Sequence, residues 1–157
     1  MKNKTTLYIA NGAMIAAIYV VLTLLLAPIS YGAMQVRISE ALCILPMFTS
    51  AAIPGLFVGC LLANLLGGAV IWDVIFGSLA TLIGAVGSYL VRKNRWLVPI
   101  PPIAANVVII PLVLKYGYGV DMALPPLAGY LAVGEIVSCY LLGEILCSVL
   151  LRLKLFK

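Results

Sequence analysis

The chain has 157 residues, of which 64% are hydrophobic and only 10% are charged, with a net charge of +5 and a mean hydropathy of +1.19. A soluble domain of this length cannot bury so much apolar surface in one core, so lipid is the expected solvent. Histidine is absent, which removes the commonest general base and metal ligand. We therefore expect neither an enzyme nor a metal site. The four cysteines lie in apolar runs without C-x-x-C spacing and are interpreted as packing residues.

Charged residues and prolines divide the chain into six apolar stretches, and each is predicted to cross the membrane as an α-helix. Together they form a single membrane domain over residues 1–157, with spans at about 7–27, 41–53, 55–71, 74–91, 97–114 and 126–151. The first stretch is too long for a signal peptide, so we expect it to be retained. The predicted fold class is an all-α integral membrane protein, a compact bundle of six transmembrane helices.

The second and third spans come from one long uncharged stretch, Ala41 to Trp72. This stretch is too long for one crossing. Pro46 weakens the helix, and Pro54-Gly55 is predicted to divide it into two short spans. A re-entrant segment is the alternative for the first of these.

The distribution of basic residues orients the bundle. Lysines and arginines gather near the N-terminus, in the loop at residues 92–95, and near the C-terminus. The positive-inside rule places all three clusters in the cytoplasm, which requires four crossings and then two. Both termini are therefore predicted to be cytoplasmic. The positive charge is explained by topology and does not indicate nucleic-acid binding.

Small residues recur every fourth position in two of the predicted spans, a spacing that lets transmembrane helices approach closely. In the third span they are Gly55, Gly59, Ala63 and Gly67, which we interpret as ordinary packing within the chain. The first span carries Gly12/Ala16 and Ala13/Ala17.

Polar side chains from five segments are predicted to converge in the outer half of the membrane. Intramembrane polar groups are costly, and their convergence indicates a ligand pocket open to the outside. The candidate substrate-binding residues are Arg37, Glu40, Asn64, Trp72, Asp73, Asn106 and Glu135, with Gln35 in the same external loop.

Each candidate except Glu135 has a strong structural alternative. Asp73 is alternatively the N-cap of its helix. Trp72 and Tyr118 are alternatively aromatic residues of the membrane interface. Arg37 and Glu40 alternatively pair with each other, and the two asparagines alternatively join helices by hydrogen bonds.

Glu144 is predicted to lie away from this pocket. Nine residues separate it from Glu135. On a regular α-helix this places the two carboxylates on opposite faces, with Glu144 about 13 Å nearer the cytoplasm. We interpret Glu144 as facing a partner or pairing with a lysine, with a second site as the alternative.

The run Gln35-Val36-Arg37-Ile38-Ser39-Glu40-Ala41-Leu42, after a first span carrying an Ala-x-x-x-Ala pair, resembles a known family. It is similar to the QueT branch of the substrate-binding (S) components of energy-coupling factor (ECF) transporters, which is assigned to queuosine precursors. The resemblance implies an S component of the bacterial cell membrane that binds its ligand from outside. It also implies docking, through Ala13 and Ala17, on a transmembrane coupling subunit driven by two cytoplasmic ATPases. The chain lacks a G-x-x-x-x-G-K phosphate loop, so any ATP is used by those partners.

A 7-aminomethyl-7-deazaguanine-like base suits these side chains chemically. Its guanine-like edge offers two N–H donors to a carboxylate, either Glu135 or Glu40, and a carbonyl to the amide of one of the asparagines. Its aminomethyl cation requires a second carboxylate, Asp73 or Glu40, and Trp72 is placed to stack on the ring. Two alternatives are an S component for another flat heterocycle and a self-sufficient proton-coupled transporter using Glu135 and Glu144.

Overall fold

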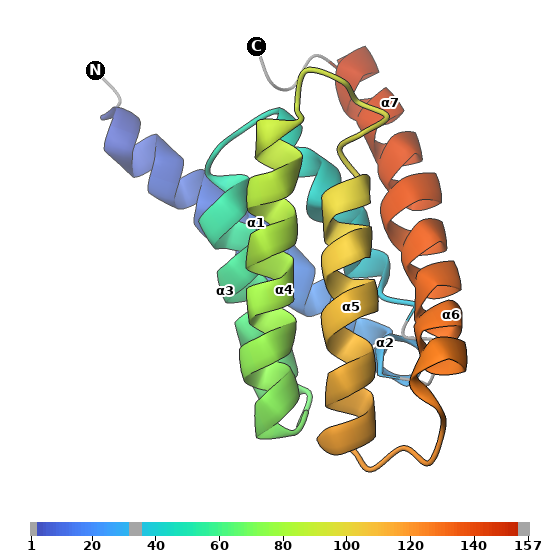
Figure 1. Ribbon diagram of the computed structural model, residues 1–157. Coiled ribbons are helices and arrows are strands. Elements are labelled where there is room, and N and C mark those ends of the chain that lie inside the picture. Colours follow the sequence, from blue (N-terminus) through green and yellow to red (C-terminus); the bar gives the residue numbers. More distant parts are fainter. Residues whose placement is uncertain (1–2, 32–35, 154–157) are drawn as a thin grey trace.

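The computed structural model describes residues 3–31 and 36–153, and within them it contains helices and no strand (Figure 1). The all-α prediction is therefore confirmed. Gln35 lies outside the described residues. The elements are α1 (Lys4–Leu25), α2 (Ala27–Ser30), η1 (Ile38–Met47), α3 (Ala52–Leu66), α4 (Ile71–Leu90), α5 (Ile100–Tyr116), α6 (Leu124–Glu135), η2 (Ile136–Leu142) and α7 (Gly143–Leu153).

Several of these helices have the length and composition of membrane spans. In the described part of the chain, α1, α4 and the continuous 30-residue rod of α6, η2 and α7 are long and apolar enough to cross a bilayer. The shorter apolar helices η1, α3 and α5 lie between them in sequence. The architecture is that of a membrane protein.

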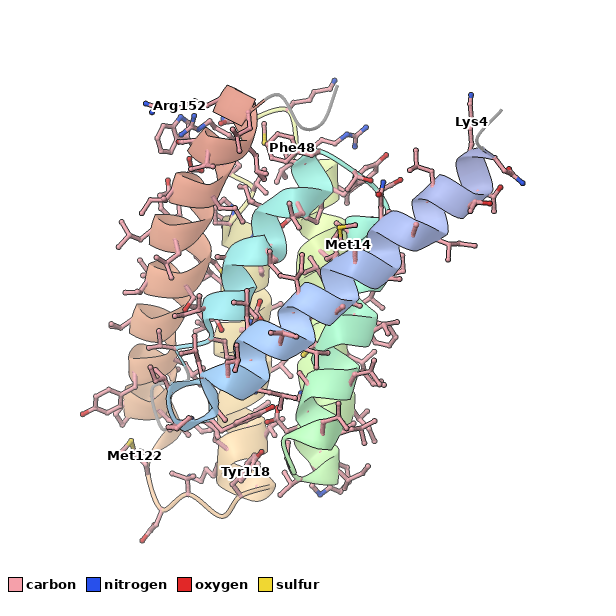
Figure 2. The ribbon with its side chains drawn as sticks, turned by 180° about the vertical axis from the view of Figure 1, so that it is seen from behind. Lys4, Met14, Phe48, Tyr118, Met122 and Arg152 are labelled. Carbon is pink, nitrogen blue, oxygen red and sulfur yellow. The ribbon has the colours of Figure 1, made fainter. Side chains whose placement is uncertain are left out.

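The two ends of the bundle differ in the residues that they carry. Figure 2 places Lys4, Phe48 and Arg152 at one end, which we call the basic end, and Tyr118 and Met122 at the other. The loop between α4 and α5 also lies at the basic end (Figure 1). The basic residues of the described chain thus gather mainly at one end, as the charge distribution predicted.

The break between the second and third predicted spans is misplaced in the sequence-based interpretation. The structure ends η1 at Met47 and begins α3 at Ala52, so the chain reverses before Pro54 and not at it. Pro54 is the third residue of α3. Proline is tolerated there because the first turn of a helix has no internal acceptor for its backbone N–H.

The element that corresponds to the second predicted span, η1, is a ten-residue 3₁₀ helix. Pro46 lies inside it, and a proline ring in a regular α-helix clashes with the carbonyl four residues earlier. A 3₁₀ helix rises about 2.0 Å per residue against 1.5 Å for an α-helix, so ten residues extend over about 20 Å. A long 3₁₀ helix is uncommon and typical of a strained or functional segment.

The last helix contains a π-helical segment, η2, between Glu135 and Glu144. Each π turn takes in more residues than an α turn, which changes the relative direction of the two side chains. Glu135 contacts Asn106 of α5, and Glu144 contacts Arg95 in the loop that leads into α5. The prediction of opposite faces is therefore wrong, because both carboxylates are buried inside the bundle.

Helices α1 and α3 pack closely through their small residues. A Cβ atom at Gly59 would lie 2.8 Å from Cβ of Tyr19 and 3.1 Å from Cα of Ala16, and one at Gly55 would meet the carbonyl of Gly12 at 2.7 Å. The glycine stripe is thus a packing surface within the chain, as interpreted. Figure 2 shows α1 crossing the bundle obliquely. Ala13 and Ala17, by contrast, are exposed on the other side of α1.

Candidate functional site

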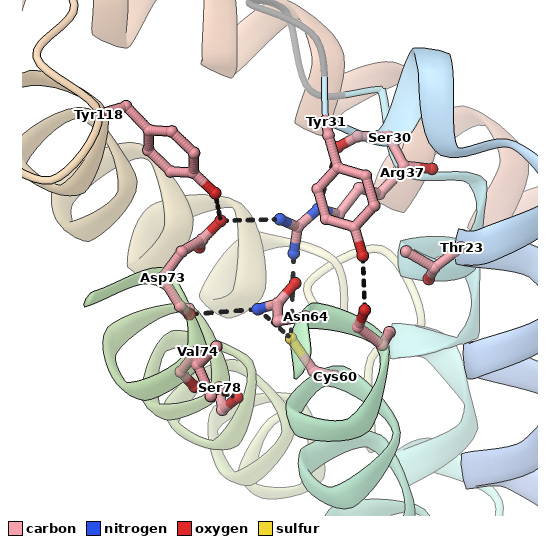
Figure 3. Close-up of polar contacts among 12 residues, drawn as sticks. Thr23, Ser30, Tyr31, Arg37, Cys60, Asn64, Asp73, Val74, Ser78 and Tyr118 are labelled. Carbon is pink, nitrogen blue, oxygen red and sulfur yellow. Dashed lines mark hydrogen bonds and ion pairs between the residues drawn. The ribbon is translucent and has the colours of Figure 1, made fainter. Parts of the chain in front are cut away.

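The carboxylate of Asp73 joins three segments that are distant in sequence (Figure 3). It lies in the first turn of α4 and is fully buried. Its Oδ2 atom is 3.5 Å from Nη2 of Arg37, which precedes η1, and accepts a 3.0 Å hydrogen bond from the hydroxyl of Tyr118 in the α5–α6 loop. We call Arg37, Asp73, Tyr118 and the adjacent Asn64 the outer cluster.

Asn64 and the surroundings of Arg37 complete the outer cluster. The amide of Asn64 donates to the backbone carbonyl of Asp73 at 3.1 Å and so joins α3 to α4. The guanidinium of Arg37 donates to the carbonyl of Ser30 at 3.3 Å and lies over the ring of Tyr31. The Oδ1 atoms of both Asn64 and Asp73 are buried without a hydrogen-bond partner. These two acceptors remain available to a ligand or to water.

The outer cluster decides three of the structural alternatives. The N-cap of α4 is Val70, and no side chain caps this helix, so Asp73 is not a cap. Arg37 pairs with Asp73, and its pairing with Glu40 is not observed. Tyr118 is half-buried and its hydroxyl donates to Asp73, so it is not simply an interfacial aromatic. Burial and the neighbouring Asp73 carboxylate raise the pKa of this hydroxyl to about 12. The phenol therefore stays a hydrogen-bond donor at physiological pH.

A second group of polar side chains lies in the interior, and we call it the carboxylate cluster. Glu40 of η1 accepts a hydrogen bond from the hydroxyl of Tyr19 in α1. Glu135, at the end of α6, accepts from the amide of Asn106 in α5 at 3.0 Å and from the thiol of Cys139 at 3.2 Å. All five side chains are buried. Glu135 was predicted to be a polar group inside the membrane domain that binds substrate, and its buried position is consistent with the first part of that prediction.

The two glutamates of the carboxylate cluster lie close together. Ligand atoms of Glu40, Glu135 and Cys139 are all within 4.8 Å of one another, a spacing that could also hold a metal ion. The ion pairs of the described residues are Arg37–Asp73 and Arg95–Glu144, so neither glutamate has a cationic partner there. Buried carboxylates without a cation are costly. The cluster therefore suits a ligand that brings several N–H donors or a positive charge.

Trp72 is separated from both clusters by the direction of its side chain. It is 53% exposed and stacks on Phe76, with ring centroids 6.0 Å apart. Both rings line an apolar groove of about 580 Å³ between α4 and α5. Neither Asp73 nor Glu135 lines this groove. The structure thus brings together Arg37, Asn64 and Asp73 in one group, and Glu40, Asn106 and Glu135 in another, and leaves Trp72 outside both.

The sequence-based interpretation missed three polar contributors. Tyr118 was interpreted as an aromatic residue of the membrane interface, and Cys139 was assigned to apolar packing. Cys139 follows Glu135 by four residues, a spacing that places two side chains on one helix face. Tyr19 is a hydroxyl-bearing residue inside a 22-residue apolar helix, which also signals a buried partner. These spacings were visible, but the partner of each residue was not.

Comparison with known proteins adds a family assignment. The family model described as QueT transporter matches residues 9–152. A queuosine precursor transporter QueT from Lactococcus lactis subsp. cremoris (strain MG1363) is 41% identical over 86 residues, which is 53% of this chain and 50% of the relative. The matched region thus spans about half the length of that curated relative. No solved structure matches the chain.

Proposed function

This chain belongs to the QueT transporter family, and from this premise we propose that it is the S component of an ECF-type importer that captures a queuosine precursor. The family match over residues 9–152 carries the proposal. The family is one of transporters and not of enzymes, as expected for this chain. The ligand in the proposal is a 7-aminomethyl-7-deazaguanine-like base, taken up from outside the bacterial cell.

The proposed topology has six crossings of the bacterial cell membrane and both termini in the cytoplasm. Its support is the gathering of Lys4, the α4–α5 loop and Arg152 at one end of the bundle (Figures 1 and 2). Basic residues of this kind remain on the cytoplasmic side. In this orientation Tyr118 and the outer cluster face the outside, where the ligand enters.

The carboxylate cluster is the proposed ligand-reading part of the pocket. Glu135 accepts the two neighbouring N–H groups of the base edge, and the amide of Asn106 donates to its carbonyl. Glu40 receives the aminomethyl cation. Asp73 is less suited to that cation, because its Oδ2 atom already has Arg37 and Tyr118 as partners. The positive charge of the ligand offsets the cost of two buried carboxylates.

The outer cluster forms the wall of the pocket on the outer side in this proposal. Arg37 and Asn64 hold the segment before η1 and the end of α3 against Asp73. The free Oδ1 atoms of Asn64 and Asp73 offer hydrogen-bond acceptors to a ligand on its way in. Trp72 contributes to the membrane-facing surface and not to this wall.

The import step depends on partners in this proposal. Ala13 and Ala17 are exposed on α1, while the neighbouring Gly12 and Ala16 pack on α3, so the small pair offers a flat surface to another helix. The proposed occupant of that surface is the transmembrane coupling subunit, which acts with two cytoplasmic ATPases. This chain binds the ligand, and ATP is used by the partners.

A matched pair of glutamate variants tests the pocket. Titration calorimetry of the detergent-solubilised chain with 7-aminomethyl-7-deazaguanine compares the wild type, Glu135→Gln and Glu144→Gln. We expect Glu135→Gln to weaken binding roughly ten- to a hundredfold, the value of charged hydrogen bonds to a buried carboxylate. Glu144→Gln removes the same charge at the basic end and is expected to leave the affinity unchanged. Equal affinities for all three proteins would remove Glu135 from the site.

A ligand panel tests the identity of the base. The neutral 7-cyano analogue has no cation for Glu40 and is expected to bind more weakly than the aminomethyl base. In Glu40→Gln the difference in affinity between the two bases is expected to be smaller. Flavin and biotin serve as other flat heterocycles. If either binds tightly while both deazaguanines do not, the chain is an S component for a different ligand.

A further inference from the structure

A groove of about 480 Å³ lies at the basic end of the last helix, away from both polar clusters. One wall is formed by α7 and the end of η2, and the other by the loop between α4 and α5. Among its lining residues are Arg95, Trp96 and Arg152. Tryptophan and arginine at the end of a transmembrane helix are typical of the membrane interface, where lipid headgroups lie.

The helix side of the groove changes from apolar to basic along its length. Leu141, Ile145 and Val149 are four residues apart and are 57%, 56% and 44% exposed. They form a continuous apolar stripe on one face of the helix. Arg152 follows one turn further toward the basic end and is exposed. An acyl chain along the stripe would bring its phosphate to the level of this arginine.

The loop side of the groove holds a second, immobilised arginine. The guanidinium of Arg95 contacts Oε2 of Glu144 at 2.7 Å through Nη2 and at 3.0 Å through Nε. It also donates to the hydroxyl of Ser148 at 3.4 Å and lies over the ring of Trp96. These contacts engage Nε and Nη2, so Nη1 remains to bind an anion. Arg95 is therefore fixed in place before any ligand arrives.

One residue that lines the groove also has an acceptor without a partner. The Oε1 atom of Glu144 is buried and makes no hydrogen bond, although Glu144 lines the groove. Two arginines and one glutamate give the groove a net positive charge, with a carboxylate oxygen beside them. This combination suits a ligand with an anionic phosphate and a neighbouring hydroxyl donor.

From these contacts we propose that the groove is a binding site for an anionic phospholipid with a hydroxyl-bearing headgroup, such as phosphatidylglycerol. Arg152 and Nη1 of Arg95 bind the phosphate, and a glycerol hydroxyl donates to Oε1 of Glu144. The acyl chain packs on Leu141, Ile145 and Val149. Basic pockets beside transmembrane helices on the cytoplasmic side recognise headgroups of this kind.

The test is native mass spectrometry of the purified chain in detergent with equimolar phosphatidylglycerol and phosphatidylcholine. We expect the wild type to retain phosphatidylglycerol preferentially and Arg152→Gln to reduce that preference about fivefold, since a basic residue near the surface contributes about 1 kcal/mol. Arg92→Gln is the matched control, because Arg92 is also exposed at the basic end but stacks on Tyr89 and does not line the groove. Neither arginine belongs to the proposed base pocket, so calorimetry with the base checks folding separately.

Two further arms separate the lipid from other occupants. Ile145→Ser is expected to weaken lipid retention, whereas binding of inorganic phosphate alone would be unaffected by this change. The proposal is overturned if both lipids are retained equally, if Arg92→Gln and Arg152→Gln have the same effect, or if inorganic phosphate displaces phosphatidylglycerol at equal concentration. The proposal is also overturned if, in the complex with the ECF coupling subunit, that subunit covers the groove and no lipid is retained there.

Discussion

Arg37 and Asp73 show how a buried ion pair joins distant segments in this chain. Their side chains are 5% and 0% exposed, and the pair holds the segment before η1 against the start of α4. Removing one partner of a buried pair leaves an uncompensated charge, whereas removing both is often nearly neutral. The pair therefore specifies the arrangement of the outer cluster more than it adds to the free energy of unfolding.

We expect Asp73→Asn to destabilise the protein by about 3 kcal/mol, the low end for a buried pair, because the 3.5 Å separation of Nη2 and Oδ2 is long. The amide still accepts from Tyr118, so the loss isolates the charge of Asp73. Thermal unfolding of the purified protein in detergent measures the effect, with the exposed Asp121→Asn as the control.

The double variant Arg37→Gln/Asp73→Asn completes the cycle. Its loss of stability is expected to be smaller than the summed losses of Arg37→Gln and Asp73→Asn, because no buried charge then lacks a partner. Strictly additive losses would mean that the two side chains do not interact in the folded protein.

At the residue scale, the sequence identified the polar positions but not their partners. Arg37, Asn64, Asp73, Glu40 and Glu135 stand out because charged or amide side chains are rare among apolar spans. Glu40 of the carboxylate cluster lies in the 3₁₀ helix η1, and Cys139 of the same cluster lies in the π-helical segment η2. Pro46 indicates that the second span is not a regular α-helix, but it does not specify a 3₁₀ helix, and no local pattern indicates η2. The pairing of Arg37 with Asp73 therefore could not be predicted.

At the element scale, the contact between α1 and α3 depends on two helices approaching closely. Gly59 is one of the closest points, since its Cβ would meet both Tyr19 and the backbone of Ala16. Tyr19 also donates to Glu40, so this contact supports the carboxylate cluster as well as the packing.

A pair of glycine substitutions tests this contact. We expect Gly59→Ala to lower the free energy of unfolding by about 1–3 kcal/mol, the usual cost of overpacking. Gly129→Ala is the control within α6, where the structure offers nothing within 4 Å of the new methyl group. Melting temperatures of the two variants in detergent distinguish the outcomes. Equal melting temperatures would show that α1 is not held tightly against α3.

Features of the helices were predicted correctly where a sequence pattern has one structural explanation, and wrongly where it has two. Pro54 was interpreted as a helix break, yet a proline in a first turn is compatible with a helix, and the real reversal is at Thr49 and Ser50. The stripe of small residues was assigned correctly because only close packing explains it. The face of Glu144 was wrong because regular α-helical periodicity was assumed across η2.

At the scale of the whole molecule, the proposed topology rests on composition and on the distribution of charge. The apolar composition is typical of a membrane protein, and in the proposed topology the basic residues at one end of the bundle lie in the cytoplasm. We expect green fluorescent protein fused to the C-terminus to fluoresce, and alkaline phosphatase inserted after Met122 to be active. The reverse pattern would place the outer cluster on the cytoplasmic side and exclude capture from outside.

The central claim is that this chain captures the ligand while partners drive import. The most direct measurement is accumulation of labelled 7-aminomethyl-7-deazaguanine in proteoliposomes loaded with ATP. We expect the chain alone to bind the base without accumulating it, and accumulation to begin when an ECF coupling subunit and its two ATPases are included. Accumulation by the chain alone that a protonophore abolishes would contradict the claim and identify a self-sufficient proton-coupled transporter.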